Sequence, residues 1–376
     1  MVIASIEWPH PYINRPPRGN VTMNELPIIS ALLASLGFSL EEHQPYVSGE
    51  RYLMAGGKLV LAGIHNESGI KVIIKASRTK DGKKEIESEK RSRDLMRSLS
   101  FADKKILIPG EFYYGTEGEY VFLIMQFIPQ DKVFVAHTIE EQFFIALSAF
   151  EAQESFHATT YEHLRTVKAV FPVLSSMEYI YEFERLKESI LRLYPDESLR
   201  ASLESADELL KRSRKILDRY GSYLTHTDFV PHNFRLAEHA LYMLDCVPNY
   251  ATIHFGNKYE GWARFLNYML IHSPELERLL VEYVRRARGE DEYRSLRLMR
   301  IYKIAFLLEY YARALGKTTG DLHELMLLRL SYWREALTAI LEDRPLSSEV
   351  TEHYVSVRNT LRSEEEKKRQ REFSIA

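Results

Sequence analysis

The stretch LTHTDFVPHNFRL, residues 224–236, places a histidine, an aspartate, a proline and an asparagine between apolar residues. His226, Asp228 and Asn233 in this stretch follow the spacing H-x-D-x-x-x-x-N. One interpretation is a polar turn between two strands. The other is a catalytic loop that binds phosphate and magnesium. The rest of the chain decides between the two.

Phosphoryl transfer gives this spacing a chemical reason. The reaction needs a carboxylate beside the acceptor hydroxyl and magnesium ions on the phosphates, with little covalent help from the protein. Asp228 is the candidate carboxylate. Asn233, and Asp245 at the end of the apolar run LYMLD, supply oxygen atoms of the kind that suits Mg²⁺. A hairpin that joins strands near 223 and 243 would bring Asn233 and Asp245 together.

A second group of candidates lies upstream of this stretch. Lys75 belongs to the apolar run IKVIIKAS, residues 70–77, which is typical of a strand. It is either an edge-strand lysine that points at water or a lysine that reaches the α- and β-phosphates of a nucleotide. Gly56 and Gly57 lie in the preceding turn, where the lack of side chains lets backbone N–H groups approach phosphate. A plain hairpin turn is the alternative for this glycine pair.

Length and charge restrict the class of protein. The chain has 376 residues, more than one hydrophobic core usually holds, so two lobes are expected. A net charge of −3 is unlike that of a basic nucleic-acid binder, and no nucleic-acid partner is expected. No apolar run suits a membrane span, and the first residues do not resemble a secretory signal. A single cysteine, Cys246, excludes an internal disulfide and suits a cytoplasmic location.

The two halves of the chain differ in hydrophobic pattern. After a proline-rich arm and a short helix over 24–38, turn signals separate five apolar or alternating runs: 51–55, 58–64, 70–77, 105–115 and 120–128. The charged segment 83–99 predicts one helix after the third run, which makes an α+β lobe. Beyond residue 138 the pattern is mainly helical, apart from a strand-loop-strand segment at about 223–247.

These motifs, in this order, resemble the aminoglycoside phosphotransferase/choline kinase-like family, the small-molecule phosphotransferases of the protein-kinase-like fold. Residues 225–234, THTDFVPHNF, resemble its catalytic loop, and YMLDCV, residues 242–247, resembles its second metal-binding segment. VFLIMQFIPQ, residues 121–130, resembles the hinge between its lobes, and residues 146–158 resemble the helix that usually ends in Leu-His. The similarity covers roughly residues 44–270.

The resemblance implies an α+β, protein-kinase-like two-lobed fold, with an antiparallel-sheet N-lobe and a mainly helical C-lobe. We expect an arm and short helix over 1–39 and a nucleotide-binding N-lobe over 40–127. We expect a helical C-lobe with the catalytic loop and acceptor site over 128–362, and a charged tail over 363–376. The oligomeric state is not predicted.

The same resemblance implies ATP or GTP and Mg²⁺ as cofactors. The nucleotide would lie in the cleft against the hinge, where its adenine edge would meet backbone groups of Gln126, Phe127 and Ile128. Lys75 would hold phosphates, with Glu89 of the predicted helix as its partner. Glu85 and Glu87 are alternative partners on that helix, or the helix presents a charged face to solvent.

The resemblance also implies roles in the C-lobe. Asn233 and Asp245 would hold magnesium, and Asp228 would orient the acceptor hydroxyl and accept its proton. His226 would hold the loop by hydrogen bonds. The expected function is therefore ATP-dependent transfer of the γ-phosphate to a hydroxyl of a small molecule.

Two departures from the family pattern keep other classes open. Thr227 stands where the family usually has glycine, and Cys246 and Val247 stand where Trp-Glu is common. They motivate an alternative, a catalytically inactive nucleotide-binding regulator or scaffold. A protein-serine kinase is a third possibility, but no Ala-Pro-Glu segment follows Asp245.

The sequence does not identify the phosphate acceptor. Acidic and aromatic residues after Asp245 would favour a cationic acceptor through charge and cation–π contacts if they lined its site. Otherwise they are ordinary helix faces. The residues concerned are Tyr259, Glu260, Trp262, Glu309, Tyr310 and Glu324.

Overall fold

The computed structural model describes residues 25–42, 44, 58–98, 106–129, 132, 134–156, 164–237, 240–248 and 252–362. The chain forms two compact units. Unit 1 comprises the described residues up to Lys90 together with Pro109–Phe127, and unit 2 comprises Arg91–Ile108 and the described residues from Ile128 onward. Gly56, Gly57 and the strand expected over 51–55 lie outside the described residues.

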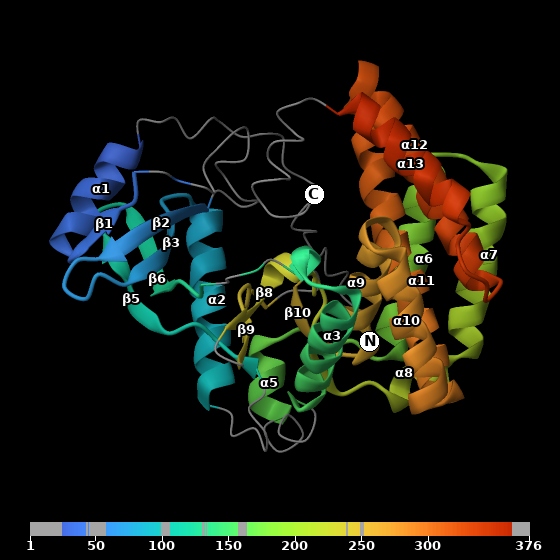
Figure 1. The fold of residues 1–376 in the computed structure, drawn as a ribbon, viewed down its shortest axis with the longest axis horizontal. Coiled ribbons are helices and arrows are strands. Elements are labelled where there is room, and N and C mark those ends of the chain that lie inside the picture. The colour runs from blue at the N-terminus through green and yellow to red at the C-terminus, as the bar shows by residue number, and fades with distance from the viewer. Residues whose placement is uncertain are drawn as a thin grey trace, which may run out of the picture. The chain divides into compact units, whose positions relative to one another are not determined.

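Unit 1 is an antiparallel sheet with helical segments (Figure 1). The strand order is β1-β2-β3-β6-β5, and every neighbouring pair is antiparallel. The strands are β1 (Phe38–Leu40), β2 (Leu59–His65), β3 (Lys71–Ser77), β5 (Glu111–Glu117) and β6 (Tyr120–Gln126). Helix α1 (Glu25–Ser35) packs beside β1, and α2 (Lys80–Ser98) follows β3 and continues into unit 2. Buried side chains of α1 and of the strands form its core: Ile29, Leu33, Leu61, Ile74 and Phe122.

The strands of unit 1 differ from the sequence prediction in two places. The first strand of the sheet is β1, which starts directly after Gly37, where the predicted helix ends. Gly37 has φ +83°, a conformation that favours glycine and turns the chain out of the helix. The run 105–115 is not one strand, because Pro109 has no N–H for a ladder bond. It divides into β4 (Ile106–Leu107), which belongs to unit 2, and β5.

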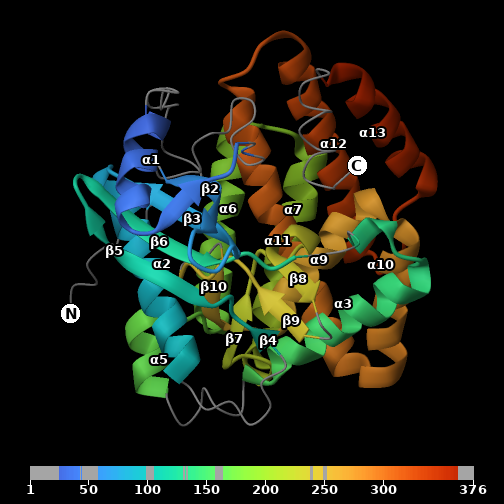
Figure 2. The ribbon, with the colours of Figure 1, turned by 60° about the vertical axis from the view of Figure 1, so that its left-hand side comes forward.

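Unit 2 is mainly helical and is organised around α11 (Glu290–Leu315). This long helix packs against α6 (Ser176–Leu193), α9 (Tyr259–His272) and α12 (Gly320–Leu341), as Figure 2 shows. Its remaining helices are α3 (Ile139–Glu154), α5 (Leu164–Val170), α7 (Glu197–Arg212), α8 (Arg214–Arg219), α10 (Pro274–Tyr283) and α13 (Ser348–Leu361). Short 3₁₀ turns at Phe134–Ala136 and Pro231–Asn233 and a π-helical turn at Val284–Arg288 connect them.

Two small sheets in unit 2 hold the stretch 224–236. β7 (Tyr223–His226) pairs antiparallel with β10 (Ile253–Gly256). β8 (Phe234–Ala237) and β9 (Ala240–Met243) form a hairpin, which β4 extends as a parallel strand. The expected hairpin between strands near 223 and 243 was therefore wrong, because residues 227–233 form a loop and a 3₁₀ turn before the strand that pairs with β9.

The antiparallel sheet of unit 1 and the helices of unit 2 confirm the predicted α+β class. None of the helices among the described residues combines the length and the apolar character needed to cross a lipid bilayer.

Replacing Phe150 by alanine tests the core of unit 2. Its ring stacks on Trp262 with centroids 4.1 Å apart, and both side chains are fully buried. We expect Phe150→Ala to lower the free energy of unfolding by about 3–5 kcal/mol. Phe144→Ala, at a position on the same helix that is 64% exposed, should change it by less than about 0.5 kcal/mol. Guanidinium denaturation followed by tryptophan fluorescence measures both, and equal losses would contradict the packing.

Candidate functional site

The stretch 224–236 forms a closed polar loop between β7 and β8. The Asn233 Nδ2 amide donates to the backbone oxygen of Asp228 at 2.7 Å and to its Oδ2 at 3.2 Å. Asn233, five residues after Asp228, thus lies within hydrogen-bond distance of it. The structure brings together the two residues that the H-x-D-x-x-x-x-N spacing singled out, while their catalytic roles stay predictions.

Asp245 lies at the open end of the adjoining hairpin. Phe234 pairs with Met243 across the two strands, and the Leu244 N–H donates to the Asn233 carbonyl at 3.0 Å. The residue after Leu244 is Asp245, so the backbones of the two predicted magnesium ligands come close together at the end of β8 and β9. Their joint role as magnesium ligands stays a prediction.

His226 ties the loop to its surroundings. Its Nε2 donates to the Asp245 carbonyl at 2.7 Å, and its backbone N–H donates to Gln153 Oε1 of α3 at 3.2 Å. Burial lowers the pKa of His226, although the carboxylates of Asp228 and Asp245 oppose that shift. A neutral, buried histidine that donates to a carbonyl holds the loop and does not carry a proton to substrate, which agrees with its expected structural role.

A buried polar cluster, formed by Glu260, His254, Lys303 and Tyr179, lies beneath the loop. Glu260 is 1% exposed, 2.7 Å from His254 Nε2 and 3.1 Å from Lys303 Nζ, and it accepts from the Tyr179 hydroxyl at 2.8 Å. Burial opposes ionisation, but His254 and Lys303 nevertheless hold the pKa of Glu260 at about 2. The cluster therefore fixes β10, α6, α9 and α11 to one another.

Gly261 brings this cluster against the loop. A Cβ atom at Gly261 would lie 2.6 Å from the His226 carbonyl oxygen, so any side chain there would force the backbones apart. The first turn of α9 can approach the loop only because this residue is glycine. In the sequence, a glycine between Glu260 and Trp262 in a predicted helix was the signal for such a close approach.

The residues proposed to line a cationic acceptor site lie mostly in the core. Glu260, Tyr259, Trp262 and Glu309 are buried, and Glu309 pairs with Arg313 and accepts from Ser189. Tyr310 and Glu324 are exposed. The burial of these four side chains favours the alternative interpretation, ordinary helix packing. Each of the two buried carboxylates has an internal cationic partner, Lys303 for Glu260 and Arg313 for Glu309.

Arg264 is a site residue that the sequence reasoning missed. Its Nε donates to Asp228 Oδ1 at 2.8 Å, and the two side chains are 23% and 30% exposed. Burial would lower the pKa of the guanidinium, but the Asp228 carboxylate outweighs burial and raises it. Asp228 thus lies between the amide of Asn233 and a permanent cation. In the sequence, the signal for Arg264 was its position one helical turn after Glu260.

Lys75 and Glu89 form a buried ion pair in unit 1. Lys75 Nζ donates to both carboxylate oxygens of Glu89 at 2.6 Å, and the Glu89 side chain is fully buried. Glu85 instead pairs with Lys58 at 2.8 Å, and Glu87 is exposed. The predicted pairing of Lys75 is therefore present, while its contact with nucleotide phosphates stays a prediction.

Lys58 is a second buried lysine beside Glu89. Its Nζ lies 3.9 Å from Glu89 Oε2, and its side chain is 1% exposed. Lys58 was not among the residues predicted from the sequence, because a lysine before an apolar run is most simply a solvated strand end.

The expected hinge residues have ordinary backbone partners. The Gln126 N–H donates to the Gly110 carbonyl at 2.8 Å, and the Phe127 N–H donates to the Lys71 carbonyl at 3.1 Å. Ile128 is buried. Their predicted contacts with the adenine edge stay predictions.

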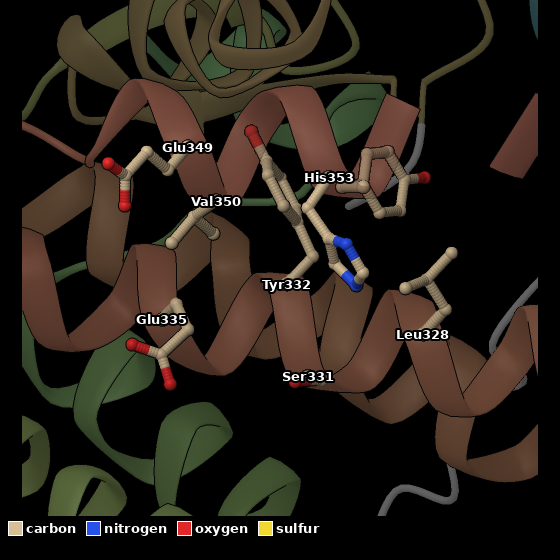
Figure 3. A pocket seen from close by; sticks show the side chains of 8 residues that line it. Leu328, Ser331, Tyr332, Glu335, Glu349, Val350 and His353 are labelled. Carbon is tan, nitrogen blue, oxygen red and sulfur yellow. The ribbon is translucent and has the colours of Figure 1, made fainter. Parts of the chain in front are cut away.

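A hollow of about 290 Å³ lies between α12 and α13, away from these residues in the sequence. Figure 3 shows Glu335, Glu349 and His353 around it. None of the predicted site residues lines this hollow.

Comparison with known proteins gives structural matches alone. No protein-family model and no curated protein sequence matches the chain. A GDP complex of a wild-type aminoglycoside 2′-phosphotransferase matches with a TM-score of 0.57 at 15% identity, over 82% of this chain and 97% of that one. The chain has the aminoglycoside phosphotransferase fold. This result confirms the resemblance and the protein-kinase-like fold expected from the sequence.

Two further matches of this fold carry different acceptor names. A thermostable aminoglycoside phosphotransferase variant in a ternary complex with ADP and hygromycin B matches with a TM-score of 0.54 at 15% identity, over 85% of this chain and 98% of that one. A macrolide 2′-phosphotransferase matches with a TM-score of 0.54 at 13% identity, over 84% of this chain and 98% of that one. The aminoglycoside phosphotransferase fold thus accommodates more than one class of acceptor.

Removing the buried charge of Glu260 should change how stability depends on pH. The pKa of Glu260 in the folded protein, about 2, lies below its ordinary value of 4.5, so ionised Glu260 stabilises the fold above about pH 5. That contribution, on the order of 3 kcal/mol, is lost as pH falls toward 2. Glu260→Gln should therefore destabilise the protein by about 3–5 kcal/mol at pH 7 and by less than half as much at pH 3.

Urea denaturation of both proteins at pH 7, 5 and 3 measures this difference. Glu197→Gln, at a position where the side chain is 88% exposed, should change the free energy of unfolding by less than about 0.5 kcal/mol at each pH. A Glu260→Gln effect of equal size at pH 7 and pH 3 would contradict the buried ion-pair description.

Proposed function

We propose that the protein is a phosphotransferase that moves the γ-phosphate of ATP or GTP to a hydroxyl of a small molecule. The observation that carries this proposal is the loop in which Asn233 bonds Asp228 and the hairpin register places Asp245 beside Asn233. The aminoglycoside phosphotransferase fold supports it, as do the ADP and GDP present in complexes of proteins with this fold.

Asp228 would orient the acceptor hydroxyl and accept its proton as transfer proceeds. Its two carboxylate oxygens are each held, Oδ1 by Arg264 and Oδ2 by Asn233, so the side chain is fixed before an acceptor arrives. A preorganised carboxylate contributes chiefly by position, because a correctly placed group avoids the entropy cost of aligning the reactants. Most of the rate enhancement would then come from positioning and charge stabilisation.

The donor set of this loop fits a magnesium ion. The Nδ2 end of Asn233 is used by Asp228, which leaves its Oδ1 as the ligand atom, and Asp245 adds a carboxylate. Mg²⁺ is usually held by one or two carboxylates together with substrate phosphates, and this donor set would supply the protein's share. A bound magnesium would neutralise charge on the nucleotide phosphates.

Lys75 would contact those phosphates from unit 1. Glu89 accepts two hydrogen bonds from its Nζ, so the ammonium group has one preferred position. Because Glu89 is fully buried, its charge needs the lysine as a partner. We propose that Glu89 positions Lys75 and that Lys75 makes the contact.

The two departures from the family pattern do not remove any of these groups. Thr227 is buried, and its N–H donates to the Thr252 carbonyl at 2.6 Å. Cys246 is a small buried core residue. Both side chains therefore occupy the interior of the loop region, and their identity is compatible with an active site. ATP turnover measured with and without magnesium separates this proposal from an inactive nucleotide-binding regulator.

Asp228→Asn tests the proposed base. The variant should fold and bind ADP like the wild type, but its turnover with an accepted alcohol should fall by roughly 10² or more, the usual contribution of a positioned acid or base. ADP formation and calorimetric ADP binding measure the two properties. Asp291→Asn, an exposed carboxylate of the same unit, is the matched control and should leave turnover unchanged. Near-normal turnover of Asp228→Asn would remove this residue from the mechanism.

Asp245→Ala and Asn233→Ala test the proposed magnesium ligands. Each variant should weaken ADP binding by roughly tenfold or more when magnesium is present, since a lost ligand costs at least as much as a lost outer-shell contact. In excess chelator, ADP affinity should change much less. Calorimetric titrations under both conditions give the comparison, and equal losses with and without magnesium would exclude a ligand role.

A further inference from the structure

Arginine side chains lie on three helices of unit 2, α9, α12 and α13. Arg264 on α9 bonds Asp228 directly, and Tyr268 lies one turn further along that helix. Helix α13 packs against both α9 and α12. It contributes Arg358, and α12 contributes Arg329, which lies 5.1 Å from the centre of the Tyr311 ring.

The charges of Arg264, Arg358 and Arg362 each act on the hydroxyl of Tyr268. Burial raises the pKa of the Tyr268 hydroxyl, and the charges that oppose this shift are those of Arg264, Arg358 and Arg362. Arg358 of α13 and Arg362, which follows that helix, therefore act on the same tyrosine as Arg264. Of these three arginines, Arg264 is the one shown to contact Asp228.

Arg358 is a buried cation with weak internal compensation. Its side chain is 8% exposed, its guanidinium bonds Asn359 Oδ1 at 3.3 Å, and it lies 5.6 Å from the centre of the Tyr354 ring. In the part of the chain that the structure describes, no carboxylate lies within 4.0 Å of it. A buried charge is costly unless an opposite charge or several hydrogen bonds compensate it. An anion is the ligand that would do so.

Arg264 has the geometry for the same ligand. Asp228 is the carboxylate within 4.0 Å of its guanidinium among the described residues, and the bond to Asp228 is made through Nε. A guanidinium has five N–H donors, and its planar fork matches the oxygens of a phosphate or a carboxylate. Arg264 can therefore bind an anionic group next to the carboxylate that would receive the acceptor hydroxyl.

We infer that the acceptor is an anionic alcohol, a small molecule that carries a phosphate or carboxylate group within a few bonds of the hydroxyl that is phosphorylated. Arg264 would bind the anionic group, with Arg358 supplying a second positive charge. This inference rests on the proposed phosphotransferase function. The residues that would have favoured a cationic acceptor do not oppose it, because Glu260 and Glu309 are buried and paired with Lys303 and Arg313.

The reaction needs no further reagent. The acceptor oxygen forms a bond to the γ-phosphorus of the nucleoside triphosphate, and the bond from that phosphorus to the β–γ bridging oxygen breaks. The hydroxyl proton passes to Asp228, and the nucleoside diphosphate leaves. Charge repulsion between an anionic acceptor and the nucleotide phosphates is what a permanent cation beside Asp228 would offset.

Matched acceptors that differ in charge test the inference on the full-length protein. ADP formation with magnesium and ATP is measured for glycerol, glycerol 3-phosphate and glycerate, for a hexose and its 6-phosphate, and for choline and an aminoglycoside. We expect at least one anionic compound to exceed its neutral counterpart by roughly tenfold or more in kcat/KM. The phosphate and carboxylate members distinguish the two anionic groups.

Variants of Arg264 and Arg358 show whether these residues bind the charge. Arg264→Gln should lower kcat/KM for the preferred anionic acceptor by roughly 10- to 100-fold, mainly through KM, the range for a lost hydrogen bond to a charged group. Arg264→Lys should restore part of it, and Arg358→Gln should give a smaller loss. Arg192→Gln, an exposed position on α6 with the same change of charge, is the matched control.

Binding provides a readout that does not depend on turnover. Calorimetric titration of glycerol 3-phosphate and glycerol into the protein with magnesium and ADP should show binding of the phosphate ester, which Arg264→Gln weakens. Equal affinity for both compounds, or equal affinity of wild type and Arg264→Gln, would overturn the anionic-acceptor inference. Preferred turnover of choline or the aminoglycoside would overturn it too, while supporting phosphotransfer. Absence of both ADP binding and ADP formation would instead overturn the proposed function.

Discussion

The position of the loop at residues 227–233 depends on one buried carboxylate, Glu260. Its oxygens are held by His254, Lys303 and Tyr179, which come from a strand and two helices of the same unit. Because a lone charge in the interior is unstable, these partners cannot move apart without exposing it or neutralising it. The next residue, Gly261, lies directly under the His226 carbonyl. The ion-pair cluster therefore fixes the position of α9 against the loop that carries Asp228.

The two carboxylate oxygens of Asp228 have partners of different charge. Asp228 has a neutral donor on one oxygen and the Arg264 guanidinium on the other, and Arg358 and Arg362 act on the same neighbourhood through Tyr268. A scaffold built to attract cations would expose carboxylates at this position. Here Glu260 and Glu309 are buried with Lys303 and Arg313 as partners, and Arg264 is a cation in contact with Asp228.

The sequence was sufficient for the features that depend on short-range spacing. The five-residue separation of Asp228 and Asn233, and the apolar run that ends at Asp245, each determine a local geometry, and the structure has both. Glu89 was the expected partner of Lys75, with Glu85 and Glu87 as alternatives, and the structure pairs Lys75 with the buried Glu89. What spacing could not give was the pairing of β7 with β10 or the contact of Arg264 with Asp228, because both depend on residues about 30 or more positions apart.

The same limit explains why the sequence left two interpretations open for the acidic and aromatic residues after Asp245. Composition indicated that carboxylates and aromatic rings were present after Asp245, but whether a helical glutamate faces solvent or an internal lysine depends on the helix packed against it. For Glu260 that helix is α11, which supplies Lys303. Once this pairing is formed, the face of α9 left beside the loop is the one that carries Arg264 and Tyr268. The cationic side chain that α9 presents to Asp228 thus depends on the packing of α9 on α11.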